Sequence, residues 1–256
     1  MPPGALAAGH SPRMMPPDLS AFGTIAALRP LTGGHRNSVW LVERGGVPLV
    51  AKSTARTEAA LRWLGPVQAA ARGAGFGVPG LIAAGDGRFA PQGWTLEPFA
   101  FGIAARADDL PRLGARIAAF HRGARAFGQR PGFVALPDLI GRDRGGDADL
   151  SLLPAPLAAA IRAAFAPFAG QAAQPVHGDL TASNLIHAAE GPTLIDWDEA
   201  RADLPFLDLI ALRAPTPAEL RAQLAMEVAT GWTREPAHAR TLAASLLAPV
   251  AGAQDG

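Results

Sequence analysis

The residues best suited to catalysis lie in the second half of the chain. The pattern His-x-Asp-x4-Asn spans residues 177–184, and a short apolar run ends at Asp196. Phosphoryl transfer needs a carboxylate to accept the proton of the attacking hydroxyl, oxygen ligands for Mg²⁺, and a cation that orients the phosphates. Asp179 suits the role of the base, and Asn184 and Asp196 suit the roles of Mg²⁺ ligands.

Lys52 provides the cation that such a site requires. It is the one lysine among the 23 Lys and Arg residues of the chain, and it ends a β-rich run that begins at Val47. An ammonium is a compact point charge, whereas a guanidinium is a planar fork with fixed donor directions. A chain that uses arginine elsewhere and keeps one lysine here indicates a position that needs a compact ammonium, with chance as the alternative interpretation. Within the set above, Lys52 suits the phosphates.

Further motifs stand in a fixed order around these residues. They are Leu31-Thr32-Gly33-Gly34-His35-Arg36-Asn37-Ser38-Val39-Trp40, Leu113-Gly114 with His121, His177-Gly178-Asp179 with Asn184, Leu194-Ile195-Asp196-Trp197-Asp198, and Leu204-Pro205-Phe206-Leu207-Asp208-Leu209. From about residue 28 to residue 212, this order resembles the aminoglycoside phosphotransferase and choline kinase-like family, which are small-molecule relatives of the protein kinases. The chain has neither an Asp-Phe-Gly nor an Ala-Pro-Glu motif, so it is less similar to the protein kinases themselves.

The resemblance implies a role for each matching residue. Asp179 corresponds to the catalytic base, and His177 to the residue that supports its backbone. Lys52 corresponds to the lysine that meets the α- and β-phosphates of ATP, and Asp208 to a buried acid that braces the catalytic loop. The implied cofactors are ATP and Mg²⁺, and the implied metal ligands are Asn184 and Asp196. The residues implied to surround the nucleotide are Gly33, Gly34, Asn37, Lys52, Glu58, Glu97, Pro98 and Phe99.

In this family the lysine usually pairs with a glutamate on the following helix, which the pattern predicts over residues 57–71. Glu58 is the one acid in that range and is our predicted partner, although it follows Lys52 by only six residues. Gln68 lies at a more ordinary distance but carries no charge. Asp198 and the Arg- and Asp-rich segment 141–149 are interpreted as solvated.

Two kinds of structure must position these residues. Residues 18–99 contain about five antiparallel strands, one of them at 81–84, and the helix over 57–71, which Pro66 is expected to kink or divide. Residues 100–256 are mostly helical, with helices predicted at 110–121, 157–168, 204–212, 217–230 and 236–247. We therefore expect an α+β, bilobal fold, which the resemblance implies is protein-kinase-like. The N-terminal lobe (18–99) is expected to contain the antiparallel sheet and to bind the nucleotide. The larger, helical C-terminal lobe (100–256) is expected to carry out catalysis and to bind the substrate. A disordered leader (1–17) is expected before the N-terminal lobe.

The composition excludes several other classes of site. The chain has no cysteine, which excludes disulfides, cysteine-ligated zinc, iron–sulfur clusters and thiol catalysis. Its formal net charge of +1 gives no electrostatic case for a nucleic-acid partner. We find no transmembrane stretch and no signal peptide, and so expect a cytoplasmic protein without a membrane partner. The oligomeric state stays open.

We therefore expect an ATP-dependent phosphotransferase that moves the γ-phosphate to a hydroxyl of a small molecule: an amino alcohol, a vitamin, a sugar or an aminoglycoside-like compound. The acids near the C-terminus, such as Glu227 and Glu235, are mixed with arginines, which favours a metabolic substrate or an amino alcohol over a polycationic antibiotic. The alternative is a nucleotide-binding pseudokinase that regulates a partner. The complete catalytic set favours the enzyme, and the unusual position of Glu58 favours the pseudokinase.

Overall fold

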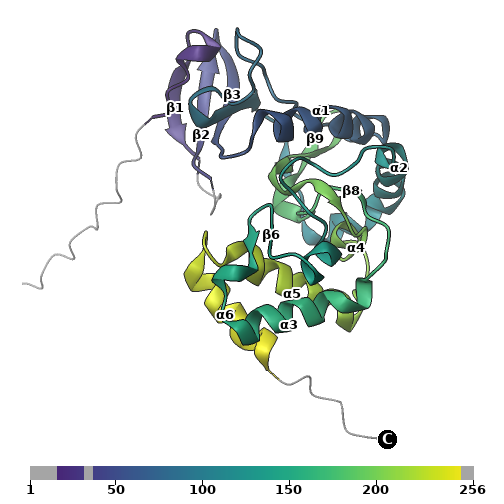
Figure 1. Ribbon diagram of the computed structural model, residues 1–256. Coiled ribbons are helices and arrows are strands. Elements are labelled where there is room, and N and C mark those ends of the chain that lie inside the picture. The colour runs from purple at the N-terminus through teal and green to yellow at the C-terminus, as the bar shows by residue number, and fades with distance from the viewer. Residues whose placement is uncertain (1–15, 32–36, 249–256) are drawn as a thin grey trace, which may run out of the picture.

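The computed structural model of the protein describes residues 16–31 and 37–248. An antiparallel sheet, called here the N-terminal sheet, lies at one end of the molecule, and three helices, called here the C-terminal helices, lie at the other (Figure 1). The sheet consists of β1 (Ala26–Pro30), β2 (Val39–Arg44), β3 (Val47–Ser53) and β4 (Trp94–Pro98), in that spatial order. The C-terminal helices are α3 (Ala155–Phe165), α5 (Pro217–Gly231) and α6 (Pro236–Leu247).

The two faces of the N-terminal sheet have different surroundings. Successive side chains of a strand point to opposite faces, and directly paired residues share a face. Trp40, Val42 and Leu96 are buried on one face, in a core cluster that includes Leu19 and Phe22. The paired residues on the other face include Val39, Val50, Lys52, Thr95 and Glu97. Lys52 and Glu97 therefore project from the same face, away from that core.

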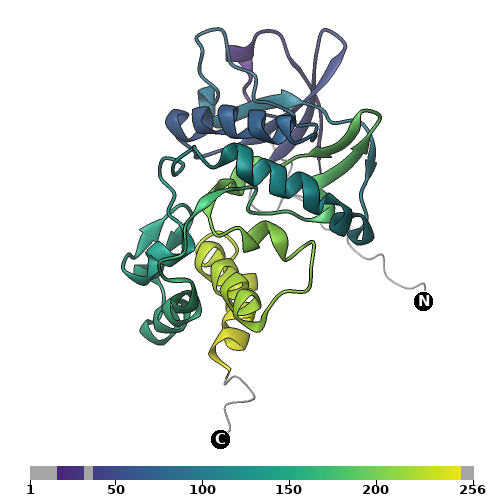
Figure 2. The same ribbon diagram turned by 90° about the vertical axis from the view of Figure 1, so that its right-hand side faces the viewer.

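Helix α1 (Glu58–Gly73) packs beside α2 (Gly114–Ala124), as Figure 2 shows. Thr57 caps α1 by accepting a hydrogen bond from the Ala60 amide, which is a usual way to begin a helix. The helix continues through Pro66, so the prediction that this proline divides it is wrong. Its apolar face is buried in one core cluster with residues of α2, and this burial offsets the backbone hydrogen bond that proline cannot donate.

Paired strands hold the ends of two loops in the middle of the molecule. β8 (Gln174–Val176) pairs with β11 (Arg201–Asp203), and β9 (Leu185–Ala188) pairs with β10 (Gly191–Leu194) and with β5 (Ile103–Ala104). The first loop, residues 177–184, connects β8 to β9, and the second loop, residues 195–200, connects β10 to β11. These two loops carry most of the predicted catalytic residues.

The remaining elements are short. Helix α4 (Phe206–Leu209) follows β11, and the hairpin of β6 (Arg144–Gly145) and β7 (Ala148–Asp149) contacts α5. The 3₁₀ helices are Ser20–Phe22, Pro91–Gly93, Ala107–Leu113, Leu136–Ile140, Leu150–Leu152, Ala166–Phe168, Ala182–Asn184 and Trp197–Glu199.

The helices predicted at the C-terminus agree best with the structure, and α6 has the predicted bounds. The strand predicted at 81–84 does not form. The Ile82 amide donates a hydrogen bond to the Leu96 carbonyl of β4. The Ala84 amide donates to the Arg88 carbonyl instead of to β4, so the pairing does not continue as a β-ladder. The lobe boundary predicted between residues 99 and 100 stays a prediction, and the predicted leader lies outside the described residues except for its last two. No helix in the described ranges combines the length and the apolar surface that crossing a bilayer requires.

Candidate active site

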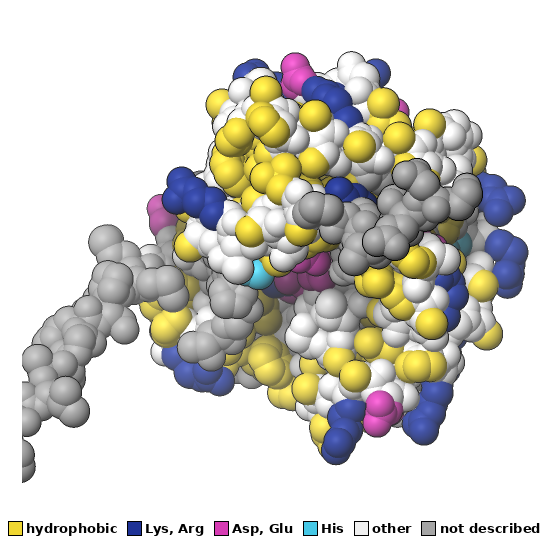
Figure 3. Space-filling model, turned by 90° about the horizontal axis from the view of Figure 1, so that it is seen from below, with side chains coloured by type: hydrophobic (Ala, Val, Ile, Leu, Met, Phe, Trp, Pro, Cys, Tyr) yellow, Lys and Arg dark blue, Asp and Glu magenta, His cyan; other side chains and the backbone are white. Residues whose placement is uncertain are grey.

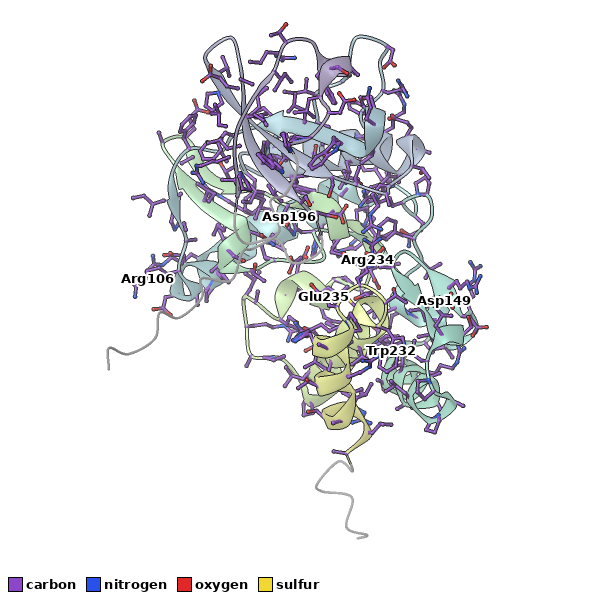
Figure 4. The ribbon with its side chains drawn as sticks, turned by 90° about the vertical axis from the view of Figure 1, so that its left-hand side faces the viewer. Arg106, Asp149, Asp196, Trp232, Arg234 and Glu235 are labelled. Carbon is purple, nitrogen blue, oxygen red and sulfur yellow. The ribbon has the colours of Figure 1, made fainter. Side chains whose placement is uncertain are left out.

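A cleft of about 660 Å³ lies between the N-terminal sheet and the C-terminal helices. Val39 and Lys52 line it from the sheet, both loops line its middle, and Glu227 lines it from α5. Figure 3 views the molecule from below and shows Asp and Glu side chains gathered in a central hollow of that face. In Figure 4, Asp196 lies near the junction of the two ends of the molecule, and Glu235 lies on the side of the C-terminal helices.

The first loop is anchored by the buried carboxylate of Asp208 in α4. Its two oxygens accept hydrogen bonds from the backbone amides of His177 and Gly178, each at 2.9 Å, and His121 Nε2 lies 2.9 Å from Oδ2. Burial raises the pKa of Asp208, but the hydrogen bonds and the neighbouring histidines outweigh this effect and leave the pKa below its usual value. The ionised carboxylate thus braces the loop, as the resemblance implied.

Gly178 lets the first loop pass close to the second. Its φ is +82°, and a Cβ atom at this position would lie 2.7 Å from the carbonyl oxygen of Glu199. Glycine adopts such a conformation without steric cost and has no Cβ to collide with that carbonyl. The glycine of the His-Gly-Asp motif is therefore explained by contact between the two loops.

Asp179 and Asn184 form the polar pair of the first loop. Asn184 Nδ2 donates to Asp179 Oδ2 at 2.8 Å and to the Asp179 carbonyl at 3.0 Å. Asn184 is buried, whereas Asp179 is exposed and lines the cleft. The hydrogen bond fixes the direction of the Asp179 carboxylate and leaves the group accessible to a hydroxyl in the cleft.

Asp196 stands in the second loop in a conformation that is rare for residues other than glycine. Its φ is +61° and its ψ is +66°. Residues held in this left-handed region cluster at functional sites, where the surrounding structure compensates their cost. The Asp196 side chain lines the cleft, and the preceding residue is tied to the first loop because His177 Nε2 lies 3.0 Å from the Ile195 carbonyl oxygen.

Lys52 pairs with Glu97, so the prediction that Glu58 is its partner is wrong. Lys52 Nζ lies 2.8 Å from Glu97 Oε1 and 3.6 Å from Asp196 Oδ1. Burial lowers the pKa of Lys52, but these two carboxylates outweigh it and raise the pKa above its usual value. The lysine therefore carries its positive charge in the cleft.

Glu58 has other partners because it lies in the first turn of α1. Its carboxylate accepts hydrogen bonds at 2.9 Å from the backbone amides of Phe89 and Ala90. This contact ties the segment before β4 to the start of the helix. Gln68, the other candidate, is buried and lines a small cavity together with Lys52 and Glu97.

The other predicted nucleotide-binding residues are placed in part. Asn37 lines the cleft. Phe99 directly follows β4, and its amide donates to the Pro48 carbonyl at 3.3 Å, so this amide is already used within the sheet region. Gly33 and Gly34 lie outside the described residues. Contacts of these residues with a nucleotide stay predictions.

Arg56, between β3 and α1, is a site residue that sequence reasoning missed. Its guanidinium donates to both carboxylate oxygens of Asp198, at 3.1 and 2.8 Å, and of Asp147, at 2.8 and 3.0 Å. Asp147 also accepts a hydrogen bond from Arg234 at 2.8 Å. Asp147 and Asp198 are therefore ion-paired rather than solvated. No sequence signal pointed to this, because the partners lie 91 and 142 positions away from Arg56.

The same network shifts the pKa values of its members. Burial lowers the pKa of Arg56, but its hydrogen bonds to Asp198 and Asp147 outweigh that effect and raise it. Burial raises the pKa of Asp198, and the bonds and charge of Arg56 lower it below its usual value. Both groups are consequently held in their charged forms at neutral pH.

Arg130 is a second residue that sequence reasoning missed. It is fully buried, and its Nη1 donates to the carbonyl oxygens of Asp198 and Ala200 at 2.6 and 3.0 Å, while Nε donates to the Ala60 carbonyl at 3.1 Å. Burial lowers its pKa to about 10. Arg130 therefore holds the second loop against α1.

Six carboxylates line the cleft. The carboxylates that line it belong to Asp179, Asp196, Asp198, Glu199, Glu227 and Glu235. Among the described residues of its lining, Lys52 is the one Lys or Arg side chain. Arginines outside this lining pair with two of these acids, because Arg56 binds Asp198 and lies 3.7 Å from Glu199, and Arg201 lies 3.5 Å from Glu199.

The donor set at the two loops suits Mg²⁺. Asn184 and Asp196 offer oxygen atoms, and Mg²⁺ commonly takes one or two protein ligands together with substrate phosphates and water. Within residues 16–31 and 37–248, no three His, Cys, Asp or Glu side chains cluster as a metal site. Phosphate oxygens would therefore have to complete the coordination of a metal held here.

Comparison with known families gives one match that spans most of the chain. The model of a family described as the phosphotransferase enzyme family matches residues 27–243. A search of curated proteins found no match.

Several solved structures share the fold. A thermostable mutant of the aminoglycoside phosphotransferase APH(4)-Ia, in a ternary complex with ADP and hygromycin B, is 15% identical, with a TM-score of 0.56 and coverage of 91% of this chain and 97% of that chain. An amicoumacin kinase in complex with AMP-PNP, Ca²⁺ and Ami is 11% identical, with a TM-score of 0.59 and coverage of 87% of both chains. A candidate fructosamine-3-kinase from Thermobifida fusca is 19% identical, with a TM-score of 0.50 and coverage of 88% and 94%. These likenesses confirm the predicted α+β, kinase-like fold.

Proposed function

The chain belongs to the phosphotransferase enzyme family, and from this membership we propose that it transfers the γ-phosphate of ATP to a hydroxyl group of a small molecule that also carries ammonium groups. The observation that supports this most directly is the convergence of Lys52, Asp179, Asn184 and Asp196 on one cleft. These are the cation, the base and the oxygen ligands that phosphoryl transfer requires.

In the proposed reaction, Asp179 accepts the proton of the acceptor hydroxyl. The hydroxyl oxygen forms a bond to the γ-phosphorus, and the bond from that phosphorus to the bridging oxygen of ADP breaks. Asn184 keeps the Asp179 carboxylate directed at the cleft through its hydrogen bond at 2.8 Å. The products are a phosphate ester and ADP, and the proton remains on Asp179 until it passes to solvent.

The phosphates of ATP need positive charge on the side of the cleft near the N-terminal sheet. Lys52 supplies one such charge. Asn184 and Asp196 would hold Mg²⁺, which when bound supplies further neutralisation of the phosphate oxygens. The left-handed backbone of Asp196 keeps its carboxylate at this edge of the cleft.

The charge of the cleft supports an acceptor with ammonium groups. Glu199, Glu227 and Glu235 line the cleft in addition to the three aspartates of the two loops. An acceptor with a cationic group near its hydroxyl could form an ion pair with one of these carboxylates, which a neutral sugar could not. Amino alcohols, amino sugars and aminoglycosides share this chemistry.

The pseudokinase alternative was favoured by the unusual position of Glu58, the predicted partner of Lys52. Glu97 supplies an acid 2.8 Å from Lys52 Nζ, which favours an enzyme. A cytoplasmic location and Mg²⁺ as the metal stay predictions.

The test is an ATP-consumption screen with acceptors in matched pairs, such as glucosamine against glucose and an amino alcohol against the corresponding diol. We expect the amine of each productive pair to be phosphorylated with the higher kcat/KM. Glu235→Gln and Glu227→Gln should raise KM for amine acceptors, whereas Glu190→Gln, an exposed carboxylate in the turn between β9 and β10, should not. A preference for the neutral member of the pairs would contradict the proposed acceptor class, and an absence of ATP turnover with every acceptor would contradict the activity.

A further inference from the structure

We propose that Glu97 is the positioning residue for Lys52, so that the carboxylate which orients the phosphate-binding lysine comes from strand β4 and not from helix α1. This inference rests on the proposed function, because it concerns how Lys52 is held for the phosphates of ATP. The resemblance placed Glu97 only among the residues around the nucleotide. The structure directs its side chain at the lysine.

The geometry of the pair follows from the sheet register. Lys52 on β3 is paired with Thr95 on β4, and Val50 on β3 is paired with Glu97. Lys52 and Glu97 are thus diagonal neighbours on one face of two adjacent strands, a spacing that long side chains bridge. The two charged groups meet at 2.8 Å, with the lysine side chain 17% exposed and the glutamate side chain 10% exposed.

The other candidate partners of Lys52 have other roles or carry no charge. Asp196 lies 3.6 Å from Nζ, but it is 45% exposed and is the candidate metal ligand. Glu58 accepts the backbone amides of Phe89 and Ala90. Gln68 borders the same small cavity as Lys52 but is neutral. Glu97 is therefore the acid that holds Lys52 without removing a ligand from the metal.

A specific defect should follow when the Glu97 carboxylate is neutralised. Lys52 would then have Asp196 as its nearest acid, and a tighter Lys52–Asp196 pair would compete with a divalent cation for the same carboxylate. The lysine would also move away from the phosphates. We therefore expect a lower kcat together with a higher Mg²⁺ concentration for half-maximal activity. A side chain that merely stabilised the fold would not change the Mg²⁺ requirement.

The experiment compares Glu97→Gln with the wild-type chain in ATP turnover over a range of Mg²⁺ concentrations, using the acceptor found above or water as the acceptor. Because a displacement of about 1 Å can cost about 10²-fold in rate, we expect kcat to fall by roughly 10- to 100-fold. The half-maximal Mg²⁺ concentration should rise several-fold, at least about threefold by the competition described above. Glu43→Gln, which removes a carboxylate from β2 opposite Pro48, is the matched control and should change neither value.

A rescue variant separates positioning from direct contact with the nucleotide. The double variant Glu97→Gln/Gln68→Glu moves the carboxylate from strand β4 to helix α1, and both positions line the same small cavity. We expect this double variant to recover turnover and the wild-type Mg²⁺ requirement. A folded double variant that stays as defective as Glu97→Gln would overturn the proposal in favour of direct nucleotide binding by Glu97.

The outcomes are distinguishable from failure of the proposed function. If the wild-type chain turns over no ATP, the proposed function fails. If the wild type is active and Glu97→Gln keeps its kcat and Mg²⁺ requirement within about twofold, a free-energy change of roughly 0.4 kcal/mol, the inference fails. If thermal melting shows that Glu97→Gln does not fold, Glu97→Asp is tested in its place. This variant keeps the negative charge but has a shorter side chain. An unchanged Mg²⁺ requirement in Glu97→Asp would overturn the proposal.

Discussion

Asp179 directs its carboxylate into the cleft, and Asn184 holds it there through a hydrogen bond at 2.8 Å. Asp179→Asn preserves the size of the side chain and an oxygen that can accept this bond, but it removes the proton acceptor. We expect turnover to fall by roughly 10²–10⁴, the usual range for a general base. Steady-state kinetics give the loss, and calorimetry with Mg-AMP-PNP should show nearly unchanged nucleotide affinity. Near-normal turnover would remove Asp179 from this role.

Lys52 lines the cleft from a largely buried position beside two carboxylates. Its side chain is 17% exposed, and its ammonium stands between carboxylates at 2.8 and 3.6 Å. Lys52→Arg should reduce turnover by about 10²-fold although the charge is kept, because the broader planar guanidinium displaces the phosphates. Arg29→Lys on the exposed strand β1 makes the opposite exchange and should leave turnover unchanged. A folded Lys52→Arg enzyme with activity within a few-fold of normal would contradict the assignment.

The sequence was informative where the site residues are neighbours in one motif. Asp179, Asn184 and Asp196 were predicted because their spacing is local and their residue types are unusual among apolar neighbours. Arg56 and the Glu97 side chain were not, because their roles depend on partners that only the folded chain brings near. The left-handed φ of Asp196 was not predicted either, because a sequence pattern does not report a backbone angle.

Helix α4 acts on the first loop through one carboxylate, and this gives a pH-dependent prediction. Asp208→Asn should destabilise the protein by roughly 1–3 kcal/mol at pH 7, because the buried backbone amides of His177 and Gly178 lose their charged acceptor. The folded-state pKa of Asp208 is lowered. Its ionised form therefore stabilises the fold above about pH 4, the unfolded value, and this contribution is lost as the pH falls through the folded-state pKa.

Urea unfolding of the wild type and Asp208→Asn over pH 2.5–7 tests this expectation. The stability difference between the two proteins should be largest near neutral pH and should narrow below about pH 4. A difference that stays constant over the whole range would show that the ionisation of Asp208 contributes nothing. Asp138→Asn, in the 3₁₀ helix Leu136–Ile140, is a control carboxylate outside α4 and the loop.

At the scale of elements, prediction succeeded where a proline at the start of a helix and a periodic pattern agreed. Helix α6 begins at Pro236, a favourable first position, and ends at the predicted Leu247. Pro66 does not divide α1, because burial of the apolar face of the helix outweighs this local signal. The pattern failed at residues 81–84, where a single hydrogen bond to β4 replaces a strand.

At the scale of the molecule, Arg56 connects the end of β3 to the second loop and to the β6–β7 hairpin. Its side chain is only 9% exposed, so Arg56→Ala would leave Asp147 and Asp198 without a bidentate partner in a buried place. We expect a loss of about 3 kcal/mol in unfolding free energy and a lower turnover. Arg56→Lys should restore little, because an ammonium cannot make two bidentate pairs.

Thermal melting and denaturant titration measure this loss. Arg144→Ala is the matched control, because Arg144 pairs with Asp149 but is 72% exposed, and an exposed pair contributes little. Equal melting temperatures for Arg56→Ala and Arg144→Ala would show that the Arg56 network does not hold the cleft together.

The in-sheet pair of Lys52 and Glu97 bears on how such an enzyme is controlled. Protein kinases are switched off when the helix that carries the paired glutamate moves away from the lysine. Here both charges stand on adjacent strands of one sheet, so an outward movement of α1 would leave the pair intact. A movement of α1 would therefore not by itself separate Lys52 from Glu97.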